Sequence, residues 1–352
     1  MVKTIWMDVL TPKQAMLLGT IATKLKSKGY NVILTTRNYD YTHAVLKNLG
    51  LEFISIGGYG DTLISKLLEE INRMKSLVEV VGDKFDVSIA YPNPVAARIA
   101  FGLNKPYIAL TDSPHSEVVS RLSLPLARYV VFSKCIPIST IESFIYKRKT
   151  ELIQYNGVDE VEWLKDVYPD PNYIRSLDLE PYSYVVARPP EVKASYYRYN
   201  GATSIFSLII NRILDLNLKL LYLPRYSDDP LIQQLRTRKN VIIPSTTQGV
   251  IGYNVIYYAL AVITGGGTLA REAALLGTPG ISLFPEELYV DKCLQELGLP
   301  LTRCRNLEMC LTTLEEYLHE PDRFRYHAQI VLKMLERPSD ILLKVLAEVD
   351  PQ

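Results

Sequence analysis

The chain has 352 residues, of which 48% are hydrophobic and 22% are charged, and its formal net charge at pH 7 is +1. This length is long for one hydrophobic core and suits two domains, and the composition is ordinary for a globular protein. A net charge so close to zero gives no electrostatic basis for non-specific nucleic-acid binding, so no nucleic-acid partner is expected.

Composition also speaks against a metal site and a membrane span. The four cysteines and four histidines are dispersed and lack the spacing of a zinc motif, so neither a metal nor another cofactor is expected. No apolar run approaches the length of a membrane span, and the first residues, with Asp8 inside IWMDV, lack the pattern of a signal peptide. We therefore expect a cytoplasmic protein.

Strand and helix signals alternate through the first half. Pro12 stands at the favoured first position of a helix that Gly29 closes. Further helices are indicated from His43 to Leu49, from Asp61 to about Val81 and from Pro94 to Phe101. The predicted strands are Thr4–Leu10, Asn31–Thr36, Glu52–Ile56, Asp86–Ala90, Tyr107–Leu110, Tyr129–Ser133 and Leu152–Tyr155. This alternation predicts a doubly wound parallel sheet.

The second half repeats the pattern after a proline-containing stretch, Pro169–Pro181, where we expect the linker. Its predicted strands are Tyr184–Ala187, Leu220–Leu223, Val241–Pro244, Ala261–Ile263 and Gly280–Leu283. The tail is expected to be helical from about Asp322 to Val349. The predicted organisation is therefore a domain over residues 1–168, a second over 182–321, and a C-terminal helix over 322–352.

The most informative stretch, ALAVITGGGTLAREAALLGTPGISLF, covers residues 259–284 and predicts strand, glycine turn, helix and strand. Gly265, Gly266 and Gly267 let the backbone approach a ligand closely, and the following helix begins with unpaired amides and partial positive charge. Thr268 is expected to cap the helix or donate to a phosphate oxygen, and Glu272 lies one turn further on, within reach of a ribose. A tight structural turn is the alternative interpretation.

Ligands of open α/β sheets bind beyond the carboxyl ends of the strands, so the residues that follow each predicted strand are candidates. After the first strand, Asp8 is a candidate acid or base, and Thr11, Lys13 and Gln14 are candidate substrate contacts, with helix capping by Thr11 as the alternative. Gly58, in the turn Gly57–Gly60, could contact a substrate or form a plain turn.

The loop after the fifth strand carries Asp112 and, three residues later, His115. A histidine titrates near neutrality and can take a proton from an attacking hydroxyl, so the pair is a candidate acid/base site. Turn hydrogen bonds and a helix start are the alternative. In the second half, Arg225, Ser245 and Thr246 follow predicted strands and are weaker candidates for donor contacts.

These motifs resemble those of known enzymes. The sequence GGGTLAREAALLGTP is similar to the donor-binding turn and helix of GT-B nucleotide-sugar enzymes, which include the UDP-GlcNAc 2-epimerases and the GlcNAc transferase of the lipid-linked peptidoglycan precursor. The runs WMDVLTPKQ, YNGVDE and RPPEVKASYY extend the resemblance over nearly the whole chain, to an uncharacterised, mostly archaeal family of GT-B-like proteins.

The resemblance implies two Rossmann-like doubly wound domains that face a cleft, with the C-terminal helix crossing back to the first domain. It also implies that the glycine turn and Arg188 hold the donor diphosphate and that Glu272 binds the ribose. The related family often has an Asn-Pro-Pro-His type sequence after the first strand. Lys13 and Gln14 stand there instead, so no histidine role carries over.

The leading expectation is a metal-independent, inverting glycosyltransferase with a nucleotide-sugar donor, UDP-linked by the resemblance, and His115 or Asp112 as the base. An isomerase of the UDP-GlcNAc 2-epimerase kind and a non-catalytic nucleotide-sugar-binding protein are the alternatives. The acceptor and the oligomeric state stay undetermined. A lipid-linked acceptor, with peripheral contact to the cytoplasmic face of a membrane, is left open because apolar runs such as Leu122–Leu126 are more often core.

Overall fold

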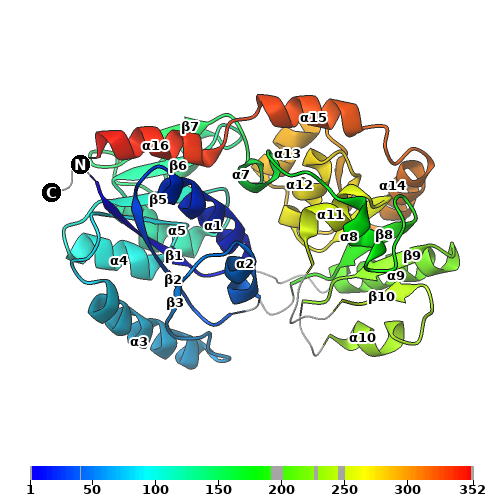
Figure 1. Ribbon diagram of the computed structural model, residues 1–352, viewed down its shortest axis with the longest axis horizontal. Helices are drawn as coiled ribbons and strands as arrows, with labels where there is room; N and C mark the ends of the chain where they lie inside the picture. The colour runs from blue at the N-terminus through cyan, green and yellow to red at the C-terminus, as the bar shows by residue number, and fades with distance from the viewer. Residues whose placement is uncertain (1, 40, 192–200, 226–228, 245–249, 350–352) are drawn as a thin grey trace. The chain divides into compact units, whose positions relative to one another are not determined.

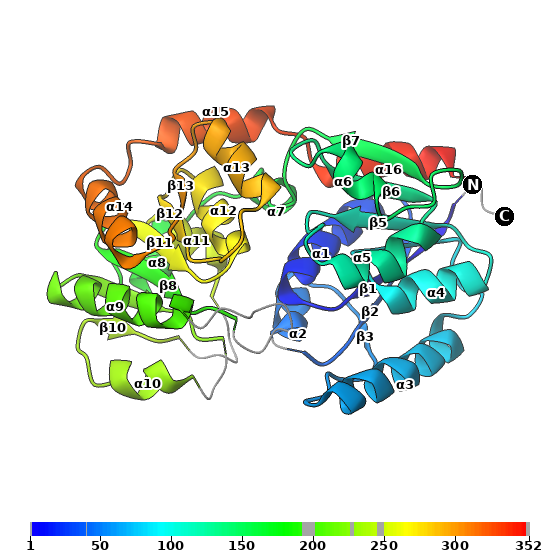
Figure 2. The same ribbon diagram turned by 180° about the vertical axis from the view of Figure 1, so that it is seen from behind.

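The computed structural model describes residues 2–39, 41–191, 201–225, 229–244 and 250–349. The chain forms two compact units, of which the first comprises residues 1–163 and 336–352 and the second comprises residues 164–335. Each unit is built around one parallel sheet flanked by helices (Figures 1 and 2). The predicted pair of Rossmann-like, doubly wound sheets is therefore confirmed.

In the described part of the first unit, seven parallel strands are arranged in the order β3-β2-β1-β4-β5-β6-β7. The central strands are buried along almost their whole length, which explains their nearly continuous apolar sequences. The chain reverses its direction of travel across the sheet between β1 and β4, so the carboxyl ends of these strands form the switch point. The strands are β1 (Thr4–Val9), β2 (Asn31–Thr36), β3 (Ile54–Ser55), β4 (Val87–Ala90), β5 (Tyr107–Thr111), β6 (Tyr129–Ser133) and β7 (Glu151–Tyr155).

The helices of the first unit include a C-terminal one, α16, which packs beside α1 and β6 (Figures 1 and 2). The side chain of Lys24 donates to Ser339 Oγ at 2.8 Å, and the amide of Ser339 donates to a buried carboxylate oxygen of Glu162 at 2.9 Å. The helices are α1 (Pro12–Ser27), α2 (Thr42–Asn48), α3 (Leu63–Val81), α4 (Pro94–Gly102), α5 (Glu117–Ser123), the 3₁₀ turn η1 (Leu124–Leu126), α6 (Ile138–Glu142) and α16 (Pro338–Glu348), and the chain leaves the unit within α7 (Val161–Leu164).

The described part of the second unit has six parallel strands in the order β10-β9-β8-β11-β12-β13. The switch point lies between β8 and β11. The strands are β8 (Tyr184–Arg188), β9 (Lys219–Tyr222), β10 (Val241–Ile242), β11 (Ala261–Thr264), β12 (Gly280–Ser282) and β13 (Leu301–Arg303). The helices are α8 (Pro171–Arg175), α9 (Gly201–Asp215), α10 (Pro230–Leu235), α11 (Gly252–Tyr257), α12 (Gly267–Leu275), α13 (Tyr289–Glu296), α14 (Leu307–His319) and α15 (Arg325–Met334).

Two segments differ from the sequence prediction. The tail expected as one helix from Asp322 contains two, α15 in the second unit and α16 in the first. The break has a local cause, because Pro338 lacks an amide hydrogen and disfavours helical backbone in the residue before it. The amide of Glu336 donates instead to the carbonyl of Asn156 at 2.8 Å. The stretch 169–181, expected as a linker, contains α8 and lies in the second unit.

Within the described ranges, no helix is both long enough and apolar enough to cross a membrane.

The approach of α12 to its sheet gives the first prediction. A Cβ atom at Gly280 would lie 2.5 Å from the carbonyl oxygen of Ala270, so β12 and α12 pack without room for a side chain. We expect Gly280→Ala to lower the free energy of unfolding by about 1–3 kcal/mol, measured by denaturant unfolding. Gly252→Ala is the matched control, because no atom lies within 4 Å of its added Cβ. Equal loss of stability in both variants would contradict this account.

Candidate active site

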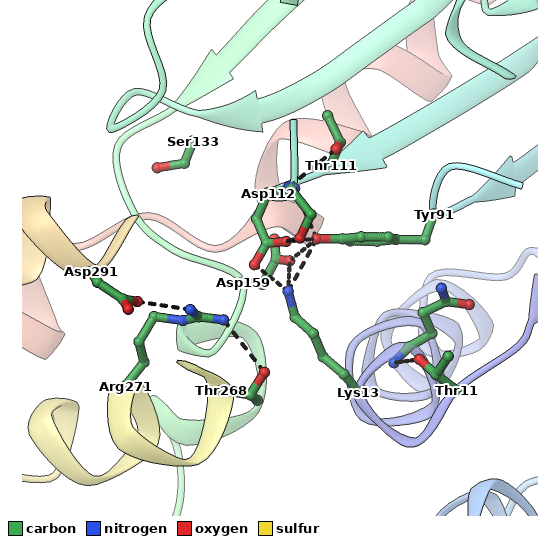
Figure 3. Close-up of polar contacts among 12 residues, drawn as sticks. Thr11, Lys13, Tyr91, Thr111, Asp112, Ser133, Asp159, Thr268, Arg271 and Asp291 are labelled. Carbon is green, nitrogen blue, oxygen red and sulfur yellow. Dashed lines mark hydrogen bonds and ion pairs between the residues drawn. The ribbon is translucent and has the colours of Figure 1, made fainter. Parts of the chain in front are cut away.

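Polar side chains converge at the carboxyl edge of the sheet in the first unit (Figure 3). Lys13 stands in the first turn of α1, after β1, and Tyr91 follows β4. Asp112 follows β5, and Asp159 lies in the loop after β7. Four strand ends therefore contribute to one group, which we call the acid/base cluster.

The Lys13 ammonium is at the centre of the acid/base cluster. Its Nζ donates to Asp159 Oδ2 at 2.8 Å and to the Tyr91 hydroxyl at 3.0 Å, and it forms an ion pair with Asp112. The side chains of Asp112 and Asp159 are only 3% and 1% exposed, whereas that of Lys13 is 19% exposed. Among these charged groups, the ammonium is therefore the one most accessible to a ligand.

Two tyrosines complete the hydrogen-bond network. The Tyr91 hydroxyl donates to Asp112 Oδ1 and accepts from the Asp112 amide at 2.8 Å. Tyr155 donates to Asp159 Oδ1 at 2.7 Å. Burial and then the neighbouring carboxylates raise the pKa of both phenols well above its ordinary value. Both hydroxyls therefore stay protonated at neutral pH, and each donates a hydrogen bond that holds its carboxylate in place.

Capping hydrogen bonds at the start of α1 fix the position of Lys13. Thr11 is the N-cap and its side chain accepts from the amide of Gln14, while Pro12 occupies the first helical position. The side chain of Gln14 in turn accepts from the amide of Leu10 at 2.8 Å. Of the three residues singled out here from the sequence, Thr11 and Gln14 cap the helix, and Lys13 joins the acid/base cluster.

Asp8, a candidate catalytic residue from the sequence, is held in a different network. Its Oδ1 accepts from Arg73 Nη2 and from Thr35 Oγ1, each at 2.6 Å. Its Oδ2 accepts from Arg73 Nη1 at 2.9 Å and from Asn93 Nδ2 at 2.7 Å. The carboxylate is fully buried and each oxygen accepts two hydrogen bonds, so its geometry fits a structural tie to α3 better than proton transfer.

Two further predicted residues lie near these networks. His115 stands in the turn after Asp112 and its side chain is exposed, while Ser113 donates to Asp112 Oδ1. The amide of Gly58 donates to Glu69 Oε2 at 3.2 Å, which fastens the turn before α3 to that helix. This hydrogen bond occupies the amide that we expected to face a substrate.

In the second unit, neighbours explain why each residue of the glycine turn between β11 and α12 lacks a side chain. A Cβ at Gly265 would lie 2.1 Å from the Cα of Pro190, so the backbone of the turn packs directly on the backbone after β8. At Gly266 a Cβ would lie 3.3 Å from Arg225 Nη2, and at Gly267 it would lie 2.4 Å from Arg271 Nη1. Two guanidinium groups therefore line the turn.

The same turn begins a helix without a side-chain cap. Gly266 is the N-cap of α12 and has no side chain to accept from the first amides. Arg225 is positioned by a hydrogen bond from Nε to the carbonyl of Pro189 at 2.8 Å and by Glu191 at 3.6 Å. Arg271 donates to Asp291 Oδ1 at 2.8 Å and lies 3.4 Å from Thr268 Oγ1 (Figure 3). The helix amides and Arg225, 17% exposed, make a site suited to phosphate, whereas Arg271, 4% exposed, is held by Asp291.

The remaining predictions from the sequence concern the donor contacts of the second unit and the absence of a metal site. Arg188 ends β8 and Glu272 lies in the second turn of α12, both half-buried, so both stand at the same edge of the sheet as the glycine turn. Ser245 and Thr246 lie outside the described residues. The part of the chain that the structure describes contains no group of three or more His, Cys, Asp or Glu side chains that could hold a metal ion.

Sequence reasoning missed three residues of these sites. Two of them could have been found from the sequence by their position after a predicted strand. Tyr91 directly follows one strand, and Asp159 lies in YNGVDE, which begins at the last residue of another. Arg271 has a weaker signal, since it stands in a predicted helix and only its spacing of three residues from Thr268 places the two side chains on one face.

Comparisons with known proteins agree with this architecture. A family model described as Protein of unknown function (DUF354) matches residues 3–349. An uncharacterized protein of Methanocaldococcus jannaschii, MJ0665, is 29% identical over 303 residues, which cover 83% of this chain and 85% of that protein.

Two solved structures are similar over nearly the whole chain. The UDP-GlcNAc 2-epimerase of Methanocaldococcus jannaschii, in complex with UDP-GlcNAc and UDP, has a TM-score of 0.76 at 14% identity, covering 98% of this chain and 100% of its own. The spinosyn forosaminyltransferase SpnP has a TM-score of 0.61 at 14% identity and covers 98% of both chains. At this identity the similarities establish the fold, which is that of the GT-B type epimerases and glycosyltransferases.

The different environments of the buried carboxylates give the second prediction. Asp8→Ala leaves the Arg73 guanidinium, 4% exposed, buried without its counter-ion, so we expect a loss of about 3–5 kcal/mol in the free energy of unfolding. Denaturant unfolding measures this loss, with Asp83→Ala, at an exposed carboxylate, as the control. The double variant Asp8→Leu with Arg73→Met should recover most of the stability. An unchanged Asp8→Ala variant would show that the pair is not structural.

Proposed function

The chain belongs to the family described as Protein of unknown function (DUF354), and we propose that it is a metal-independent, inverting glycosyltransferase that uses a UDP-linked sugar donor. The observation that carries the proposal is the glycine turn of the second unit. Arg225 and Arg271 line this turn, and α12 begins there without a side-chain cap. UDP is the nucleotide we favour because the similar M. jannaschii epimerase was solved with UDP-GlcNAc and UDP.

The charge at the glycine turn suits a diphosphate. The partial positive charge of the α12 N-terminus and the Arg225 guanidinium attract phosphate oxygens. In this proposal Glu272, in the second turn of α12, accepts hydrogen bonds from the ribose hydroxyls. When the sugar leaves, the extra negative charge on the diphosphate is stabilised by donors that are already fixed in position.

The first unit supplies the proton acceptor in this proposal. Asp112 takes the proton of an acceptor hydroxyl as its oxygen bonds to the anomeric carbon, and the bond from that carbon to the diphosphate breaks with its electron pair on the diphosphate. A single displacement of this kind inverts the anomeric configuration. We favour Asp112 over His115 because Lys13 and Tyr91 hold its carboxylate in place, while His115 is exposed on the turn.

A second reaction is favoured by one observation, the presence of Asp159 in the same network as Asp112. Epimerisation at a sugar carbon requires one group to remove a proton and another to return one on the opposite face. Asp112 and Asp159 supply two groups that can exchange protons within one network, so a UDP-GlcNAc 2-epimerase-like isomerase is the alternative. A protein that binds the nucleotide sugar without turnover is the third outcome of the experiments below.

The donor site predicts selective nucleotide binding. Calorimetric titration with UDP, GDP and dTDP should show saturable binding of UDP, and Arg225→Ala or Glu272→Ala should weaken it at least tenfold, or about 1.4 kcal/mol. Asp112→Asn, in the other unit, should leave UDP binding unchanged, and so should Arg238→Ala at an exposed site. If none of the nucleotides binds, the proposed function fails.

Solvent exchange separates the two reactions. We expect no deuterium at C2 of UDP-GlcNAc when the protein is incubated with it in D₂O without an acceptor, because a transferase leaves that carbon intact. Mass spectrometry and NMR of the recovered nucleotide sugar measure the exchange. Deuterium at C2, lost in both Asp112→Asn and Asp159→Asn, would replace the transferase proposal with the epimerase one. UDP binding without either turnover, after a screen of sugar and lipid-linked acceptors, would leave a non-catalytic binder.

A further inference from the structure

We propose that the exposed face of α3 in the first unit pairs with the α3 of a second copy of this chain, antiparallel and across a two-fold axis. The helix packs against its own unit through Arg73, Leu77 and Val81. Its solvent-facing side carries six exposed aliphatic side chains, which we call the α3 stripe: Leu63 86%, Ile64 65%, Leu67 53%, Leu68 51%, Ile71 54% and Val78 41% exposed.

The helical period gathers the α3 stripe on one side. Residues three, four and seven positions apart share a face of a helix, and the members of the stripe follow this spacing from Leu63 to Val78. The first turn is fixed by a capping box, in which Thr62 and Ser65 each accept the backbone amide of the other. The stripe therefore lies on a helix that is already formed in the single chain, so pairing costs little conformational entropy.

The two halves of α3 have complementary shapes. In the second half, Ile71, Met74, Lys75, Val78 and Glu79 line a shallow, open depression of about 390 Å³ on the surface of the helix. In the first half, Leu63 and Ile64 protrude as the two most exposed members of the stripe. A two-fold axis near the middle of an antiparallel pair sets the protruding half of each helix against the depression of the other. The antiparallel orientation also places opposite ends of the helix dipoles together.

The amount of apolar surface fits a dimer. Six aliphatic side chains with these exposures present on the order of 500 Å², which is the size of the largest apolar patch on a typical monomer, and such patches are often functional. A contact across a two-fold axis uses the same patch twice, so about 1,000 Å² would be buried, which reaches the lower limit of a specific interface. Phe101, 60% exposed at the end of the neighbouring α4, can extend this area.

The charges around the α3 stripe favour a second copy over a lipid surface. Glu70, Lys75 and Glu79 are exposed charged residues of α3, and two of the three are acidic. Helices that lie on anionic membranes instead carry lysine and arginine along their polar face. A mixed-sign border around an apolar centre is the usual anatomy of a protein interface.

Analytical ultracentrifugation of the full chain tests the proposal. We expect a dimer at micromolar concentration, and Leu67→Glu and Ile71→Glu should each raise the dimer dissociation constant at least tenfold. Met334→Glu, in α15 at a side chain that is 72% exposed, is the matched control and should leave the dimer intact. At concentrations where all variants are monomeric, their unfolding midpoints should match that of the unchanged protein, because the replaced side chains are exposed in the single chain.

Two results would overturn the proposal. A monomer at every concentration, or a dimer that neither glutamate substitution weakens, excludes pairing through α3. Flotation with vesicles of phosphatidylcholine and phosphatidylglycerol provides the second measurement. If the chain is monomeric and floats with these vesicles, and Leu67→Glu abolishes flotation, the α3 stripe is a membrane surface instead.

Discussion

The structure depends most on the pairing of charges that its first sheet buries. An ionised group taken out of water is stable only where other groups replace its hydration, and the cost of an unmatched one is several kcal/mol. At the carboxyl edge of this sheet, three aspartates are at least 95% buried, and hydrogen bonds from α1, α3, α4 and the strand-end loops satisfy them. The charges therefore fix where these helices begin relative to the strands.

The two networks at this edge differ in whether one of their charged groups is accessible to a ligand. Around Asp8, each carboxylate oxygen accepts two hydrogen bonds, and Arg73, its main partner, is itself 4% exposed. Around Asp112, the central cation is partly exposed and has a second carboxylate beside it. A network that is closed on all sides contributes stability, whereas one with an accessible member can exchange a protein contact for a substrate contact. This difference is why we place the chemistry at Asp112.

The architecture could be predicted from the sequence because the signals that specify strands and helices are local. Short apolar strands, Pro12 and Pro94 at helix starts, and glycines at helix ends each act within a few residues, and together they indicated two doubly wound sheets. The acid/base cluster was only half predictable. Lys13 and Asp159 are 146 positions apart, and no local pattern reports that their side chains meet. The break between α15 and α16 was missed because an apolar helical pattern continues on both sides of Pro338.

The charges at the strand ends of the two units suit different chemical groups. The acid/base cluster holds one ammonium and two carboxylates, so it favours groups that bring protons, such as sugar or acceptor hydroxyls. The glycine turn holds two guanidinium groups, each paired with a carboxylate, Asp291 or Glu191, and a helix N-terminus without a side-chain cap, so it favours phosphate oxygens. The proposed transfer needs both properties, since a base must accept the proton of a hydroxyl while fixed donors stabilise the charge on a leaving diphosphate.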